Sequence, residues 1–276
     1  MNSRVLKSFA VVVCASINLF GADLKENKSD LDKSLAPKVI LDMVQCKLNK
    51  AKTFSMTVLE EKGGVKSETK CVAKQHGKGV VSCRQEQRAL LTGAMAQPFV
   101  TITDHNKLYY FPTGCGNVAV RMKYLEVRKP ETPMANLFLS NGTCEMVKEE
   151  KDDYLIRYIC TPNEVNELKT AFDKQMDVKI NKDMIPAVMD YKISKQSPTL
   201  LEVTVYSERG KLISKQSFSD WLFDVEIPDS TFEVPKEFIQ YVVKSAKDAE
   251  KLQAELLKVA LAEQAKKQSQ NKQPRK

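Results

Sequence analysis

The sequence predicts an α+β protein built on an antiparallel sheet, with one helix before the sheet and another after it. Short apolar and alternating segments recur between turn residues from about residue 54 to residue 238, which is typical of antiparallel strands. Four cysteines also form two pairs, Cys71 with Cys83 and Cys144 with Cys160, whose members lie at mirror positions about a turn. Mirror positions of a hairpin face each other on neighbouring strands, within reach of a disulfide.

The first 22 residues have the pattern of an export signal. A basic start is followed by an apolar run at residues 9–20 and by a small-residue exit at Gly21 and Ala22. The run is too short to cross a bilayer. Phe20 is a poor residue at a cleavage site, so cleavage after Ala15 and an uncleaved anchor remain alternatives. We expect export of the chain and a flexible polar leader over residues 23–35.

Removing the signal also removes Cys14 and leaves six cysteines. An even number of thiols in an exported chain favours disulfides. With Cys71–Cys83 and Cys144–Cys160 assigned by mirror symmetry, the remaining pair is Cys46–Cys115. Other connectivities, buried free thiols and metal ligation are the alternatives. The chain has no CxxC, and its two histidines lie in predicted turns, so we expect no metal site.

The elements follow in a simple order. An amphipathic helix is predicted from Ala36 to Lys50, because apolar residues recur there at helical spacing. A second helix is predicted from Pro162 to Gln175 with Thr161 as its cap, and a short one at 134–139. Strands are predicted at residues 54–59, 68–74, 79–85, 99–103, 108–111, 118–122, 154–160, 176–180, 187–194, 200–207 and 212–221. We expect residues 36–238 to form one domain, although the length of the chain would also suit two small ones.

The helical period returns from Lys236. Apolar residues recur at the spacing of a coiled-coil seam, at Val242, Ala249, Leu252, Leu256 and Val259. We expect a C-terminal helix over residues 239–265 and a disordered basic tail over residues 266–276, which contains no apolar residue.

The positive charge is concentrated at this end of the chain. The formal net charge is +8, and residues 244–276 contain nine basic and four acidic residues, a net of +5. Residues 23–243 carry only about +1. A nucleic-acid-binding domain carries its positive charge on the folded surface, so we expect no nucleic-acid partner.

Catalytic motifs are missing from the sequence. It contains no nucleophile elbow, phosphate loop, dinucleotide fingerprint or zinc-protease motif. Cys115, between two glycines, is a candidate reactive thiol but fits half of a disulfide better. Asp152 and Asp153 are candidate paired carboxylates, but a solvated hairpin tip explains them better, since nothing there would shift a pKa. We expect no enzymatic activity and no cofactor.

One stretch resembles a known family. Residues 100–112 (VTITDHNKLYYFP), followed by the strand at 118–120, resemble the periplasmic lipoprotein carrier (LolA-like) family, in which a strand, a tight turn and an aromatic strand precede a further strand. The helix leading into Lys52-Thr53-Phe54 and the closing segment 218–235, with its D-x-x-F-x-x-P element, are also similar. The resemblance covers residues 36–238. The Arg-Pro or Lys-Pro step usual in that family is absent here, and Lys78 and Arg84 are only loose counterparts.

The resemblance implies a fold and a function. The fold is a curved antiparallel sheet forming an incomplete β-barrel, with helices covering an apolar cavity. The function is that of a periplasmic carrier whose cavity holds the acyl chains of a lipid or lipoprotein. Burial of each CH₂ is worth about 0.8 kcal/mol, which favours an aliphatic, adaptable concave face. The expected cavity residues are Met43, Val44, Leu48, Val58, Ile102, Leu108, Tyr110, Val120, Val203, Val205 and Phe218.

Two alternatives stay open. The same apolar residues also fit an ordinary closed core. The chain would also suit a cell-envelope interaction or sensor protein that uses this fold as a scaffold. In that case the C-terminal helix would bind an envelope protein, and the basic tail would contact an anionic membrane surface.

Overall fold

The computed structural model describes residues 36–76, 81–91, 94–95, 99–105, 107–112, 115–123, 142–176 and 181–271 of the 276-residue chain. The predicted export signal, the leader and the short helix at 134–139 lie outside the described residues. Residues 177–180, which make up most of the strand predicted at 176–180, also lie outside the described residues. Met176 is the last residue of a helix instead of the first residue of a strand.

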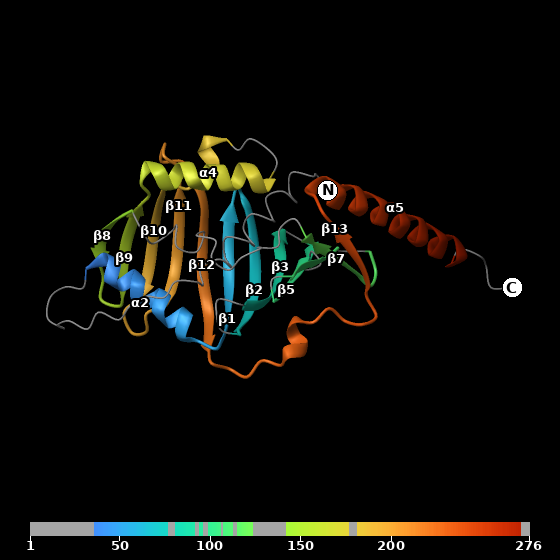
Figure 1. Ribbon diagram of the computed structural model, residues 1–276, viewed down its shortest axis with the longest axis horizontal. Helices are drawn as coiled ribbons and strands as arrows, with labels where there is room; N and C mark the ends of the chain where they lie inside the picture. Colours follow the sequence, from blue (N-terminus) through green and yellow to red (C-terminus); the bar gives the residue numbers. More distant parts are fainter. Residues whose placement is uncertain are drawn as a thin grey trace.

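The described strands form one large curved sheet made of two meanders (Figure 1). The first contains β1 (Thr53–Lys62), β2 (Val65–Gln75), β3 (Val81–Leu91), β5 (Phe99–Asp104), β6 (Lys107–Phe111) and β7 (Val118–Met122), and β4 (Ala94–Met95) pairs with β3. The second contains β8 (Thr143–Glu149), β9 (Asp153–Ile159), β10 (Val188–Ser194), β11 (Leu200–Tyr206) and β12 (Leu212–Phe223). Antiparallel pairing of β1 with β12 joins the meanders at the middle of the sheet.

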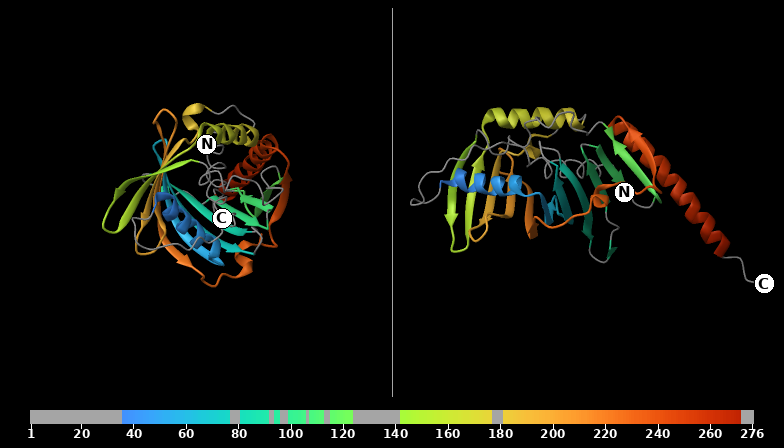
Figure 2. Two further views of the ribbon diagram at one scale, coloured as in Figure 1. Left: turned by 60° about the vertical axis from the view of Figure 1, so that its left-hand side comes forward. Right: turned by 60° about the horizontal axis from the view of Figure 1, so that its bottom comes forward.

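The sheet curls without closing. Its strand order ends at β8 on one side and at β13 (Ile239–Val243) on the other, and these two edges do not pair within the described residues. Figure 2 shows the resulting half-barrel with helices against its concave side. This confirms the expected α+β class and the incomplete barrel, whose curvature follows from the right-handed twist accumulated over many strands.

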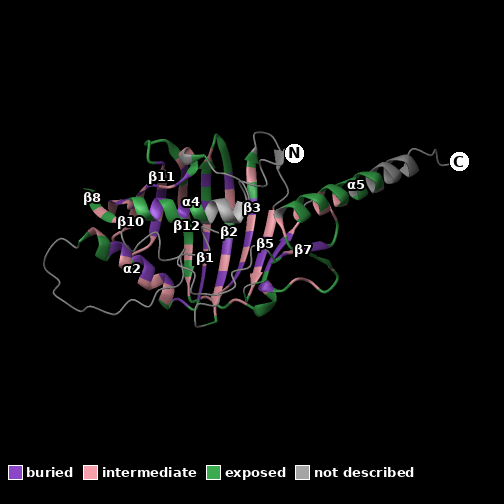
Figure 3. Ribbon diagram, turned by 45° about the horizontal axis from the view of Figure 1, so that its top comes forward, coloured by how far each residue is buried: buried purple, intermediate pink, exposed green. Residues whose placement is uncertain are grey.

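Two helices cover the second meander. α2 (Pro37–Lys50) and α4 (Pro162–Met176) pack against β8–β12, and the burial colouring in Figure 3 marks buried residues on both helices. Both agree with the predicted helices to within one residue at each end. α4 begins with a capping box: the Thr161 N–H donates to Glu164 Oε2 (2.8 Å), and the Glu164 N–H donates to Thr161 Oγ1 (3.3 Å).

The C-terminal segment differs from the prediction at its start. Residues 239–243 form β13, parallel to β7, instead of the first turns of the predicted helix. The reason is that Ile239-Gln240-Tyr241-Val242-Val243 is β-branched and aromatic, and the edge of β7 offers it hydrogen-bonding partners. α5 (Ala246–Asn271) follows and continues past the predicted end at residue 265, into the segment expected to be disordered.

The expected seam of α5 is used within the fold. Ala249, Leu252 and Leu256 pack against the cluster formed by β6, β7 and β13. Beyond Leu256 the helix leaves the body of the molecule (Figure 1), and Val259 is exposed. None of the helices in the described residues combines the length and apolar character needed to span a bilayer.

Candidate functional site

The concave face of the half-barrel is one continuous surface. The pairing of neighbouring strands aligns their inward-pointing side chains in rows that run across the sheet. One row runs from Phe223 through Phe54 and Ala73 to Cys83. The next runs along Met56, Cys71, Gln85, Thr101, Tyr110 and Val120. Side chains at every second residue of a strand share a face, so these rows define the inner surface.

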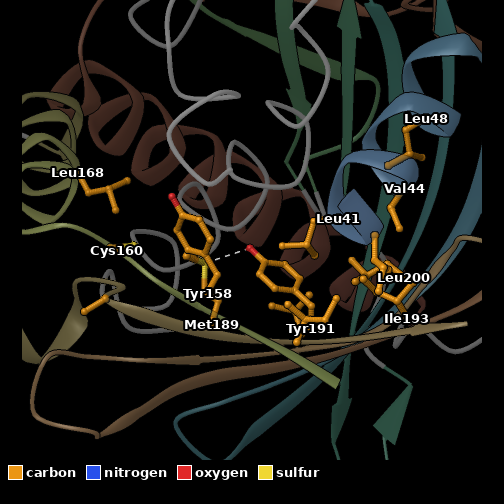
Figure 4. Packing of buried hydrophobic residues seen from close by; sticks show 14 of the residues in the cluster. Leu41, Val44, Leu48, Tyr158, Cys160, Leu168, Met189, Tyr191, Ile193 and Leu200 are labelled. Carbon is orange, nitrogen blue, oxygen red and sulfur yellow. Dashed lines mark hydrogen bonds between the residues drawn. The ribbon is translucent and has the colours of Figure 1, made fainter. Parts of the chain in front are cut away.

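Buried apolar residues on this surface form three clusters. The helix-covered cluster lies under α2 and α4 and includes Tyr158, Met189, Tyr191 and Leu168 (Figure 4). The central cluster consists of Phe54, Met56, Val58, Cys71, Ala73 and Cys83. The edge cluster comprises Leu108, Tyr110, Val118, Val120, Met122 and Val243 and is covered by α5. A filled domain usually has one contiguous core, so the division leaves the inner surface in separate apolar regions.

An aromatic row links the first two clusters. Phe218, Trp221 and Phe223 of β12 pack against both. The Trp221 ring lies 5.5 Å from that of Phe223 and 6.2 Å from that of Phe218, measured between centroids, in stacked arrangements. Trp221 Nε1 donates to the carbonyl of Leu200 at 2.9 Å, which fixes the indole plane. The rings therefore form a fixed apolar strip across the middle of the sheet.

A groove of about 410 Å³ opens at one end of this strip. Its lining combines apolar side chains with two lysines: Met43, Cys46, Lys47, Lys50, Ala51, Pro198, Phe223 and Asp224. The Lys47 ammonium lies 4.5 Å from the centre of the Phe223 ring and donates to Ser197 Oγ. Burial lowers the pKa of Lys47. The groove is thus an apolar slot with a basic rim, next to the aromatic strip.

The predicted cavity residues are distributed over these features. Val44, Leu48 and Val203 belong to the helix-covered cluster, and Val205 and Phe218 pack against it. Val58 is in the central cluster, whereas Leu108, Tyr110 and Val120 are in the edge cluster. Met43 lines the groove and is 41% exposed.

Ile102 is separated from the other ten. It pairs with Tyr109 and Arg84, while its neighbour Thr101 pairs with Tyr110 on the inner face. Ile102 therefore points to the opposite face of the sheet, where it is fully buried. In VTITD the inner face therefore carries Thr101, and the prediction that Ile102 lies there is wrong. When a strand is buried on both faces, its sequence does not reveal which alternate residues point inward.

Trp221 and Phe223 were not among the predicted cavity residues. Phe218 and Trp221 are an odd number of residues apart, so simple alternation places them on opposite faces. The pairing of β1 with β12 shifts between Ser55 and Thr57, opposite Asp220, which has a φ of 55°. This bulge brings Phe218, Trp221 and Phe223 to one face. The only sign of this bulge in the sequence was an aspartate, Asp220, within an otherwise aromatic strand.

The cysteines lie differently from the mirror prediction. Cys71 pairs with Gln85 and Cys83 with Ala73, so the two cysteines are diagonal neighbours instead of facing each other. Their sulfur atoms are 3.5 Å apart. The hydrogen bond from Cys71, together with burial, raises the pKa of Cys83. The register is offset because β2 extends to Gln75, which moves the centre of the turn along the chain.

The second hairpin is also offset, but in the opposite direction. Cys144 pairs with Tyr158, and Cys160 follows the end of β9. Burial raises the pKa of Cys160 to about 12. Cys46 lies on α2 and Cys115 lies between β6 and β7. All three disulfides stay predictions. Among the described residues, no group of three or more His, Cys, Asp or Glu side chains is arranged to hold a metal ion.

No family model and no curated protein matches this chain. Several solved structures have a similar arrangement. A conserved protein of Thermus thermophilus is 13% identical with a TM-score of 0.46, covering 75% of this chain and 98% of that one. A chain of the Pseudomonas aeruginosa MucA/MucB complex is 12% identical with a TM-score of 0.45, covering 72% and 61% respectively. A LolA superfamily protein from Nitrosomonas europaea is 8% identical with a TM-score of 0.32, covering 72% and 98%. Likenesses at this level carry no argument about function.

Proposed function

We propose that this protein is an exported, periplasmic carrier that holds an acyl chain of a lipid or lipoprotein on the concave face of its half-barrel. The observation that carries the proposal is the continuity between the groove at the end of α2 and the aromatic strip of β12. Phe223 belongs to both, since it lines the groove and stacks on Trp221. Beyond the charged groups that line the groove, an apolar chain would therefore meet Phe223 and then the aromatic strip that leads to the central cluster.

The energetics suit an acyl chain. Each methylene removed from water contributes about 0.8 kcal/mol, so about ten methylenes contribute roughly 8 kcal/mol before the costs of immobilisation. Met43 and Met56 are adaptable side chains that can follow a flexible chain. Lys47 and Lys50 keep the mouth of the groove solvated, which suits an opening that must face water when no ligand is bound.

Displacement of a dansylated fatty acid tests this proposal. Met43 and Val39 are both on α2 and similarly exposed, at 41% and 43%, but only Met43 lines the groove. Met43→Asp should weaken binding about tenfold or more, because it puts a charge against the ligand chain. Val39→Asp is the matched control and should bind like the unaltered chain. Equal affinities of the two variants, or no binding of the probe to the unaltered chain, would refute the proposal.

A second candidate function rests on α5. Leu257, Val259 and Leu261 are 42%, 57% and 64% exposed on the part of the helix beyond its last core contact. Exposed apolar side chains on a projecting helix suit an envelope protein that packs against them. Val259→Glu combined with Leu261→Glu should abolish retention of the full chain on protein-containing envelope vesicles, while Lys251→Glu, at an exposed position of the same helix, should not. Unchanged retention of the double variant would contradict this role.

A further inference from the structure

Two buried glutamines occupy the inner face between the central and edge clusters. Gln85 and Gln87 of β3 are 3% and 5% exposed. Gln85 lies between Cys71 and Thr101, and Gln87 lies between Thr69 and Phe99. Within the part of the chain that the structure describes, the side-chain carbonyl oxygen of each glutamine is fully buried and has no hydrogen-bond donor.

The amide nitrogens of the same two glutamines, in contrast, do contact neighbouring side chains. Gln87 Nε2 donates to Ser67 Oγ at 3.1 Å, and Gln85 Nε2 lies 4.0 Å from Cys71 Sγ. These contacts hold both amides and leave their carbonyl oxygens as the unmatched atoms. Buried acceptors are nearly always paired in folded proteins, so two orphans on one face of one strand need a cause.

Another polar pair on the inner face shows that the fold can satisfy such groups. Gln216 Nε2 donates to Glu60 Oε1 at 3.2 Å, and these residues face each other on β12 and β1. Burial raises the pKa of Glu60, which suits a carboxyl group inside the sheet. The contrast singles out the two glutamine oxygens of β3, which lack donors although the same face pairs other polar groups.

The position of the glutamines relative to the groove defines how a bound amphiphile would be oriented. From the aromatic strip of β12, the inner face crosses β1 at Met56 and β2 at Cys71 before it reaches Gln85 on β3. Strands are about 4.8 Å apart, so the glutamines lie roughly 14 Å from the aromatic strip. Met56 and Cys71, which lie between Gln85 and the strip, belong to the apolar central cluster, whereas Thr69 and Val58 lie between Gln87 and Phe218.

We propose that Gln85 and Gln87 form a subsite for the donor-bearing polar end of an amphiphile, an amide or a hydroxyl group, whose acyl chain runs from there toward the groove. The inference rests on the proposed function and adds the orientation and the chemical class of the ligand. An ester offers no donor, so this subsite distinguishes amide and hydroxyl lipids from esters of the same length.

The test compares hexadecanamide with methyl hexadecanoate, measured by displacement of the dansylated fatty acid from the full chain. The unaltered chain should bind the amide about tenfold more tightly. Gln85→Leu combined with Gln87→Leu should remove this preference without lowering the midpoint of urea unfolding, because it also removes two unpaired acceptors. A purely structural pair of glutamines would instead leave the preference intact and lower the midpoint.

The controls keep the inference separate from the function on which it rests. Gln240→Leu, on the exposed edge strand β13, should change neither ligand's affinity. If the double variant does not fold, Gln85→Met and Gln87→Met are measured singly, and each should reduce the preference. Equal binding of both ligands to the unaltered chain overturns the subsite alone. Binding of neither ligand, nor of the probe, overturns the carrier function and the subsite together.

Discussion

The two meanders differ in how completely their buried polar groups are paired. In the second meander, the buried Tyr158 hydroxyl donates to the buried Glu164 carboxylate at 2.7 Å. In the first, Gln85 and Gln87 keep buried oxygens without donors. The difference shows that one half of the sheet is built as a closed core beneath two helices. The other half retains two unpaired buried acceptors, which fits the ligand subsite that we propose there.

The largest loss of stability is expected from truncating a buried side chain in the second meander, beneath the two helices. Leu168 is 1% exposed in the helix-covered cluster, so Leu168→Ala should lower the free energy of unfolding by about 4 kcal/mol through lost burial and a residual cavity. Urea unfolding followed by circular dichroism measures this change. Met56→Ala in the central cluster should cost clearly less, because we expect that cluster to keep room for a ligand. Equal losses would remove the distinction between the halves.

The next effect concerns the first meander under oxidising conditions. Cys71 and Cys83 have their sulfur atoms 3.5 Å apart, so we expect a disulfide in the exported protein. Closing this short loop should raise the free energy of unfolding by about 3 kcal/mol relative to the reduced chain. Intact-mass measurement, before and after alkylation, detects the bond. Alkylation of both cysteines in the denatured, unreduced protein would disprove it, and Cys71→Ser with Cys83→Ser is the control for the stability difference.

A smaller loss should follow from breaking the polar network of the second meander. Glu164→Ala removes the capping carboxylate of α4 and the acceptor of the Tyr158 hydroxyl, and should cost about 2 kcal/mol. Glu164→Gln keeps an acceptor and should recover part of the loss. Thermal unfolding of the two variants at one pH gives the comparison. An alanine variant as stable as the unaltered chain would show that the network contributes nothing.

The smallest effect is a pH dependence at the end of the first meander. Burial, and then the neighbouring His105 ring stacked at 4.3 Å, lower the pKa of His76 below its usual value near 6.5. The unfolded chain therefore binds a proton more readily, so this contribution to stability is present above about pH 6.5 and is lost as the pH falls from there through the lowered pKa of the folded state. The urea midpoint should fall less between pH 7.5 and 5.5 in His76→Gln than in the unaltered chain. An identical pH dependence in the variant would contradict this assignment.

The sequence was sufficient to predict the helices and the curved sheet, but not which side chains of each strand point to the inner face. The helices at 37–50 and 162–176 were found because periodicity and caps are local signals. The bulge at Asp220, the offset of both cysteine hairpins and the inward or outward direction of Ile102 depend on pairing between strands. The same limit hid Gln85 and Gln87, since polar residues in a strand are assigned to solvent unless the register is known.

The path of the chain between β12 and β13 governs the order of assembly. Residues 224–238 lead from the middle of the sheet past β3 and β5 to its far edge, with Phe232 buried on the way (Figure 1). β13 then pairs with β7, which lies far earlier in the sequence. Contacts between such distant segments form slowly, so the edge strand should dock after both meanders exist. Until then the hydrogen-bonding edge of β7 stays open, and the half-formed molecule is most exposed to self-association at that strand.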